Sequence, residues 1–184
     1  MFTVSGTGAA ITLAATQNLI NPPIRNLKMT DINKESISLL NDLIETSKDG
    51  QKGFEESAKD LKNPQLKAFF AEHAVACATA VRELQTEVRA LGGDPETSGS
   101  VSGSVHRAWV NLKSSVTGKS DEAVLNEVER GEDHALKAYR EAAEKARKEN
   151  LPVNVVSLIE RQLAGTQKNH DQVKLLRDQV RRAS

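Results

Sequence analysis

Polar side chains of the kinds that bind metal ions fall where the helical repeat of this chain predicts core residues. At about 100° per residue, His73, Glu132 and His170 lie on the apolar sides of three separate predicted helices. Gln51 lies on the apolar side of a fourth helix, and Gln167 precedes His170 by three residues on the same helix face. A buried carboxylate without a partner is costly, so Glu132 requires a hydrogen-bonding partner or a cation.

Two interpretations of these five residues remain open. In the first, Glu132 pairs with His73 or His170. Gln51 and Gln167 then complete a hydrogen-bonded polar layer that fixes the register of the helices. In the second, Glu132, His170 and His73 bind one divalent metal ion, which is iron, manganese or zinc. Gln51 or Gln167 then supplies a weak fourth ligand.

A two-metal carboxylate site is not expected. Such sites in ferritin-like bundles use a Glu from each of two helices and a Glu-x-x-His motif from each of the other two. Gln167 stands where that motif before His170 requires Glu, and Phe70 stands in the same place before His73. Glu132 is then the one inward carboxylate, and a single carboxylate cannot neutralise two divalent ions.

The elements that position these residues are four long predicted helices, whose apolar residues recur every three or four positions. The predicted helices span residues 31–61, 64–91, 121–150 and 152–182. Short connections around Asn63 and Leu151 make the first two and the last two helices antiparallel hairpins. A long link over residues 92–120 joins the hairpins, and its apolar residues from Val105 to Val116 predict a short helix within it.

One long crossover between two hairpins is the ferritin-like arrangement. We therefore predict an all-α, antiparallel four-helix bundle with ferritin-like connectivity and a short helix in the crossover. With that connectivity, Gln51, His73, Glu132 and His170 all lie about 28 Å from the same end of the bundle. A simple up-down-up-down bundle would instead offset the two halves of this group by about 10 Å. The crossover topology therefore predicts a single polar layer.

The charge and cysteine content of the chain exclude further classes of function. Among the 184 residues, 25 are basic and 25 acidic, so the net charge is zero and the chain lacks the overall charge of a nucleic-acid-binding protein. Cys77 is the single cysteine, so an internal disulfide is impossible and a cytoplasmic location is expected. Because Cys77 lies on an apolar face, we interpret it as an inert core thiol.

The first residues differ from the rest of the chain. The first 28 residues are rich in small and apolar residues, and Pro22 and Pro23 near the end of this stretch precede the periodic region. They lack the basic start of a secretory signal, and their polar residues interrupt any stretch able to span a membrane. We expect residues 1–30 to be a poorly ordered extension, with Met29 as an alternative start, and residues 31–184 to form the bundle.

Several motifs are together typical of one family. They are LNDLIETSKDGQKGF, LGGDPETSGSVSGSVHRAW, ERGED with AYREA, and ERQ followed by NHDQVKLLRD. With these motifs the chain resembles the uncharacterised bacterial ferritin-like four-helix-bundle proteins over about residues 31 to 180. The resemblance implies the ferritin-like fold and a bacterial cytosolic setting that is often related to stress, but no established activity. Members often carry Glu where this chain has Gln51.

The function expected from these features is a non-enzymatic structural, interaction or stress-related role with a polar core layer. The alternatives are a protein that binds a single divalent metal ion and, third, a redox enzyme that uses this ion. A homodimer or another protein partner is compatible with the sequence, whereas nucleic acid and membrane partners are not expected. Glu129, which lies at the margin of its helix's apolar side, is expected at the surface, as is His134.

Overall fold

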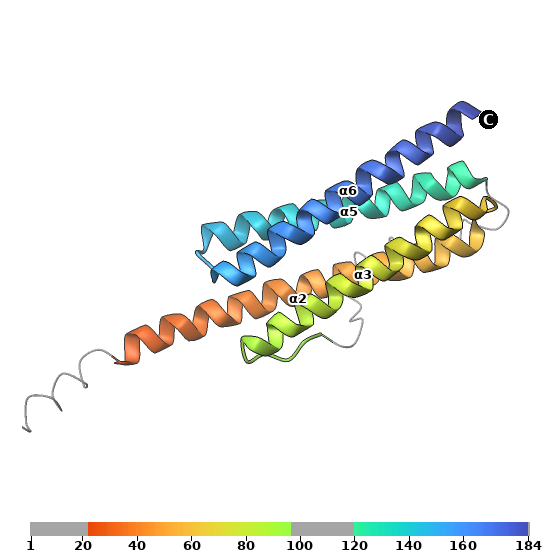
Figure 1. The fold of residues 1–184 in the computed structure, drawn as a ribbon. Helices are drawn as coiled ribbons and strands as arrows, with labels where there is room; N and C mark the ends of the chain where they lie inside the picture. Colours follow the sequence, from red (N-terminus) through yellow and green to blue (C-terminus); the bar gives the residue numbers. More distant parts are fainter. Residues whose placement is uncertain (1–21, 97–119, 184) are drawn as a thin grey trace, which may run out of the picture.

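The computed structural model describes residues 22–96 and 120–183, with side chains described from residue 29 onward. Four helices make up this part of the chain, and no strand occurs in it. They are α2 (Pro22–Asp60), α3 (Pro64–Ala90), α5 (Asp121–Lys148) and α6 (Val153–Ala183). Helices α2 and α3 form one antiparallel hairpin and α5 and α6 the other, and the hairpins pack side by side (Figure 1). The predicted all-α four-helix bundle is confirmed.

Polar residues and prolines set the helix ends. The side chain of Asn63 accepts hydrogen bonds from the backbone N–H groups of Gln65 and Leu66 at the start of α3, and Pro64 occupies its first turn. The start of α2 differs from the prediction, because the helix begins at Pro22 rather than at residue 31. Proline is tolerated in a first helical turn, so Pro22 and Pro23 open the helix instead of preceding it. Residues 1–21 and the expected crossover helix at 105–116 lie outside the described residues.

The connectivity is ferritin-like. The Asp121 carboxylate accepts hydrogen bonds from the backbone N–H groups of Lys62 at 2.6 Å and Asn63 at 3.0 Å. Helix α5 therefore begins beside the α2–α3 turn, whereas α3 runs about 40 Å away from that turn before it ends. The end of α3 and the start of α5 therefore lie at opposite ends of the bundle, as one long connection between the two hairpins requires (Figure 1).

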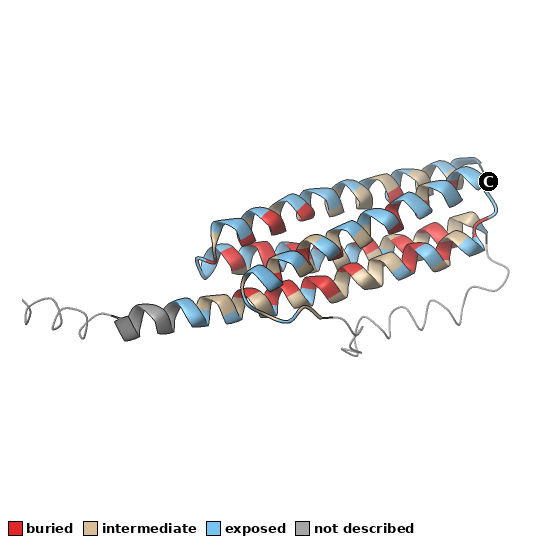
Figure 2. Cartoon of the chain, turned by 60° about the horizontal axis from the view of Figure 1, so that its bottom comes forward, coloured by how far each residue is buried: buried red, intermediate tan, exposed pale blue. Residues whose placement is uncertain are grey.

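Two apolar clusters divide the core along the bundle axis. The first lies near the α5–α6 turn and includes Leu40, Leu84, Tyr139, Leu151 and Ile159. The second lies near the α2–α3 turn and includes Phe54, Phe70, Leu125 and Val173. Buried positions face the interior along all four helices (Figure 2). The buried polar residues Ser47, Glu132 and Gln162 line a cavity between these two clusters.

The four helices do not pack with equal closeness. Helix α2 packs closely against α3 and α5, and α5 packs closely against α6, whereas α3 and α6 make few contacts. Small residues stand where these two helices face each other, among them Ala76, Ala80 and Gly165. The bundle is therefore open on the side between α3 and α6. No helix in the described ranges has both the length and the apolar character needed to cross a bilayer.

Candidate functional site

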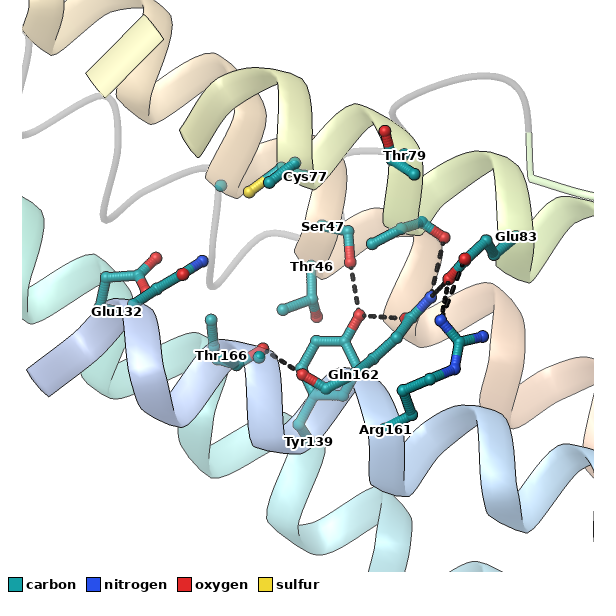
Figure 3. A pocket seen from close by; sticks show the side chains of 16 residues that line it. Thr46, Ser47, Cys77, Thr79, Glu83, Glu132, Tyr139, Arg161, Gln162 and Thr166 are labelled. Atoms are coloured by element: carbon teal, nitrogen blue, oxygen red, sulfur yellow. Dashed lines mark hydrogen bonds and ion pairs between the residues drawn. The ribbon is translucent and has the colours of Figure 1, made fainter. Parts of the chain in front are cut away.

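A cavity of about 360 Å³ lies in the middle of the bundle, and side chains from all four helices line it (Figure 3). Its lining includes Tyr139 of the first apolar cluster and Cys77 of the second, so the cavity lies between the two. Thr79, Arg161 and Gly165 are exposed lining residues of α3 and α6. The cavity therefore opens to solvent between these two helices.

A hydrogen-bonded network connects the four helices at one end of this cavity (Figure 3). The Tyr139 hydroxyl donates to Gln162 Oε1 at 2.8 Å and lies 2.8 Å from Ser47 Oγ. Because a phenol carries a single proton, the Ser47 hydroxyl must be the donor to Tyr139. Gln162 Nε2 in turn donates to the Ala80 carbonyl at 3.2 Å and to Glu83 Oε2 at 2.9 Å. Each helix thus contributes to one hydrogen-bonded layer, buried at Ser47, Tyr139 and Gln162 and partly exposed at Glu83, which we call the tyrosine layer.

The ionisation states within the tyrosine layer follow from its contacts. Partial burial opposes the ionisation of Glu83, but hydrogen bonds from Gln162 and Arg161 outweigh it and lower the pKa of this carboxyl. Arg161 also forms an ion pair with Glu83 at 3.0 Å. Burial raises the pKa of Tyr139, so its hydroxyl stays protonated and remains a donor at neutral pH. The layer is therefore satisfied internally, with its one carboxylate neutralised.

Glu132 lies at the other end of the cavity, apart from the tyrosine layer (Figure 3). Its side chain is only 5% exposed, and its Oε2 is fully buried without a hydrogen-bond partner in the described part of the chain. Burial raises the pKa of Glu132 from 4.5 to about 7, although the nearby His170 opposes this rise. The pKa of the Glu132 carboxyl therefore lies near neutral pH.

Cys77 is near enough to Glu132 for the two groups to interact electrostatically. Burial, reinforced by the Glu132 charge, raises the pKa of the Cys77 thiol to about 12. The thiol therefore stays protonated at neutral pH, in agreement with the inert thiol predicted from the sequence. The absence of a side chain at Gly50 leaves room beside it, since a Cβ there would lie 3.5 Å from the Cys77 sulfur.

The residues predicted to form a metal site are dispersed. His73 is buried against the Phe69 ring, with a ring-centroid separation of 3.9 Å, and its Nδ1 lies 2.9 Å from the Phe69 carbonyl. Gln51 does not line the cavity, because its amide donates to the exposed Glu55 one turn further along α2. Gln167 likewise turns to the surface, where it accepts from Arg140 and donates to Asp171.

His170 is the one predicted ligand that lies near Glu132. The two groups interact electrostatically, but the ring nitrogens of His170 contact Asp133 at 2.9 Å and Asp171 at 3.1 Å. Within the described ranges, no three His, Cys, Asp or Glu side chains converge in a way that could hold a metal ion. The structure therefore separates the five residues, and metal binding by them stays a prediction.

Sequence reasoning missed two interactions. The first is the hydrogen bond from Tyr139 to Gln162, because helical periodicity predicts only that Tyr139 faces the core. A buried phenol usually finds a hydrogen-bond partner, which was the available signal. The second is the ion pair between Arg177 and Glu129. The sequence predicts Glu129 at the surface, but its side chain is only 12% exposed. Arg177 extends from α6 across to α5 and covers this carboxylate, a contact that helical periodicity alone does not predict.

Comparison with solved structures shows the same fold in several ferritin-like proteins. A bacterioferritin from Desulfovibrio desulfuricans, described with a diiron site, superposes with a TM-score of 0.68 at 16% identity, covering 84% of each chain. A Dps protein from Vibrio cholerae O1 superposes with a TM-score of 0.65 at 14% identity, covering 80% of this chain and 91% of the Dps chain. It is described as a member of a superfamily of ferritin-like diiron-carboxylate proteins. A dodecameric thioferritin from Bacteroides fragilis superposes with a TM-score of 0.66 at 16% identity, covering 82% of this chain and 89% of the thioferritin chain.

At these identities the likeness establishes the fold alone. No curated protein matches the chain. A family model described as "Domain of unknown function (DUF2383)" matches residues 35–145, which is more than half of the chain and includes parts of α2 and α5 and all of α3. The resemblance inferred from the sequence motifs is thereby confirmed. The chain is a ferritin-like four-helix bundle that belongs to the family known as domain of unknown function DUF2383.

Proposed function

We propose that this chain is a non-enzymatic ferritin-like bundle protein with a structural or interaction role. The observation that supports this proposal is the tyrosine layer, in which Ser47, Tyr139 and Gln162 join three helices and reach the fourth at Ala80 and Glu83. Diiron-carboxylate bundles place metal-binding carboxylates on facing helices in the bundle core. Here the neutral side chains of Ser47, Tyr139 and Gln162 connect three helices across the core, and the Ala80 carbonyl and the Glu83 carboxylate complete the link to the fourth.

The donor set of this core does not fit a pair of iron ions. Such a pair needs carboxylates from all four helices to balance its charge. Glu132 is the one buried acidic residue in the described ranges, and the more peripheral Glu129 is already neutralised by Arg177. Around the cavity, α2, α3 and α6 carry Ser47, Cys77 and Gln162 among their lining residues. We therefore derive no di-iron chemistry for this chain.

A specific observation favours a second candidate, the binding of a single divalent iron, manganese or zinc ion. The unpartnered Oε2 of Glu132 and the imidazole of His170 are a carboxylate and a nitrogen donor near each other. These two residues would hold the ion. The further ligands that the sequence suggests are His73, Gln51 and Gln167, and each would have to leave its present contacts to join them. A bound ion would act as a Lewis acid or, if iron or manganese, as a redox centre.

Elemental analysis of untagged protein distinguishes these candidates. Under the first proposal we expect far less than one metal ion per chain, and no acceleration of ferrous iron oxidation by oxygen. One ion per chain that is lost in both Glu132→Ala and His170→Ala, but kept in the exposed control Glu141→Ala, would replace the first proposal with the second. Oxidation of ferrous iron at catalytic rates would overturn the non-enzymatic assignment directly.

We also propose that the chain self-associates in the bacterial cytoplasm. The thioferritin from Bacteroides fragilis, which has the same fold, is described as dodecameric. The single free thiol, Cys77, suits a reducing compartment. Sedimentation analysis of the full chain tests the first point, and a monomer at all concentrations up to the millimolar range would contradict it.

A further inference from the structure

The Glu132 end of the cavity has no role in the structural or interaction function that is proposed first. Glu132 is more than nine-tenths buried, lines the cavity, and leaves Oε2 without a hydrogen-bond partner in the described ranges. Burying an unsatisfied carboxylate is unfavourable, whether it is charged or neutral. A group that donates hydrogen bonds or carries positive charge would remove this cost if it entered the cavity.

The charge of the cavity lining favours a cation. Glu83 and Arg161 form an ion pair and cancel each other at the mouth. Cys77 and Tyr139 remain protonated because burial raises both of their pKa values. Glu132 is then the one ionisable lining residue without an opposite charge in direct contact, and the lining as a whole carries a net negative charge whenever it is ionised.

The walls and size of the cavity favour an organic cation over a bare metal ion. Small or apolar groups make up much of the wall between Glu132 and the mouth, namely Gly50, Ala76, Cys77, Ala80, Ala135 and Gly165. A volume of about 360 Å³ is within the usual range for small-molecule sites and far exceeds that of one ion. An ammonium group can also bind through one carboxylate, whereas a metal ion needs several converging donors.

We propose that this cavity binds a small primary amine, with its ammonium group on the Glu132 carboxylate and its apolar body along the wall between α3 and α6. Gly165 lies at the entrance, where a Cβ would meet no atom within 4 Å, so the amine enters past an unobstructed position. The thin contact between α3 and α6 leaves this route open. This site goes beyond the structural role proposed above, and it shares the Glu132 carboxylate with the alternative metal site, so the test is done without metal.

The test compares n-hexylamine with 1-hexanol, which has the same apolar length but no charge. Isothermal titration of the full chain at pH 8, in buffer containing a chelator, should show one hexylamine bound per chain and much weaker binding of hexanol. Glu132→Gln should weaken hexylamine about tenfold or more, because a charge-assisted hydrogen bond is lost, and should leave hexanol nearly unchanged. The exposed control Glu141→Gln should bind hexylamine like the wild type.

Gly165→Leu supplies an independent variant, because it fills the entrance without touching Glu132. We expect it to abolish binding of both ligands while the helical circular dichroism stays that of the wild type. Amide chemical-shift changes on adding hexylamine should centre on residues that line the cavity, such as Cys77 and Ala135. Equal affinity of wild type and Glu132→Gln for hexylamine, equal binding of hexanol and hexylamine, or no binding to the wild type would overturn the proposal.

Discussion

The buried carboxyl of Glu132 makes the stability of this protein depend on pH in a way that one substitution should remove. Burial raises the pKa of Glu132 in the folded chain from 4.5 to about 7. The folded state therefore holds this proton more tightly than the unfolded state, and the free energy of unfolding falls as the pH rises from 4.5 to 7. Below pH 4.5 the Glu132 carboxyl is protonated in both the folded and the unfolded state, so its ionisation does not lower the free energy of unfolding.

The magnitude follows from the difference between the two pKa values. Each pKa unit corresponds to about 1.4 kcal/mol, so the charged carboxyl costs about 3 kcal/mol of stability at pH 8. Glu132→Gln keeps the shape of the side chain and removes its titration. The stability of Glu132→Gln relative to the wild type should therefore increase by about 3 kcal/mol between pH 4 and pH 8.

Urea unfolding of both proteins at several pH values measures this difference, because titrations elsewhere in the chain cancel between them. Glu141 is the matched control, since its side chain is 66% exposed on the same helix, and Glu141→Gln should show no such dependence. A direct check is the carbon chemical shift of the Glu132 carboxyl, which should titrate near pH 7. A constant difference in stability between Glu132→Gln and the wild type across the whole range would refute the reasoning.

Three other predictions concern contacts elsewhere in the bundle. Tyr139→Phe leaves Gln162 Oε1 without its donor and should lower the free energy of unfolding by about 1–3 kcal/mol in urea titrations, and an unchanged midpoint would contradict the tyrosine layer. Arg177→Leu leaves the partly buried Glu129 unpaired, so this variant should be less stable than the double variant Arg177→Leu/Glu129→Leu. A double-mutant cycle of unfolding free energies measures the coupling, and strict additivity of the two substitutions would contradict it. At pH 8, iodoacetamide should modify Cys77 at least about a hundredfold more slowly in the folded chain than in the urea-unfolded chain. Mass spectrometry measures both rates, and similar rates would contradict the raised pKa of the Cys77 thiol.

The fold could be predicted because its signals are local or depend on chain length. Helical periodicity, the cap at Asn63 and the short connection around Leu151 are properties of neighbouring residues, and the long link between two hairpins leaves few ways to close a bundle. The start of α2 was predicted too late because proline ends some helices and begins others. Sequence alone does not distinguish these two uses.

The site was harder to predict because it depends on rotamers and on the separation of helices. Periodicity correctly placed Glu132 and His73 inside the bundle, since both are buried. It could not show that the His73 ring would pack against Phe69, or that Gln51 would turn to Glu55. An angle on a helical wheel gives the direction of a Cβ atom, whereas a long side chain can still reach the surface. The cavity itself exists because α3 and α6 stand apart, and no single helix encodes that separation.

The two polar features of the core differ in what they contribute to the folded state. The tyrosine layer is satisfied internally, and a shift of any one helix by a turn, about 5.4 Å, would break it, so it favours one register of the bundle. Glu132 has no such role, because its buried oxygen finds no partner and its charge destabilises the folded chain at neutral pH. A glutamine would occupy the same space without that titration. We therefore infer that the carboxylate at this position serves to bind the amine proposed to enter the cavity.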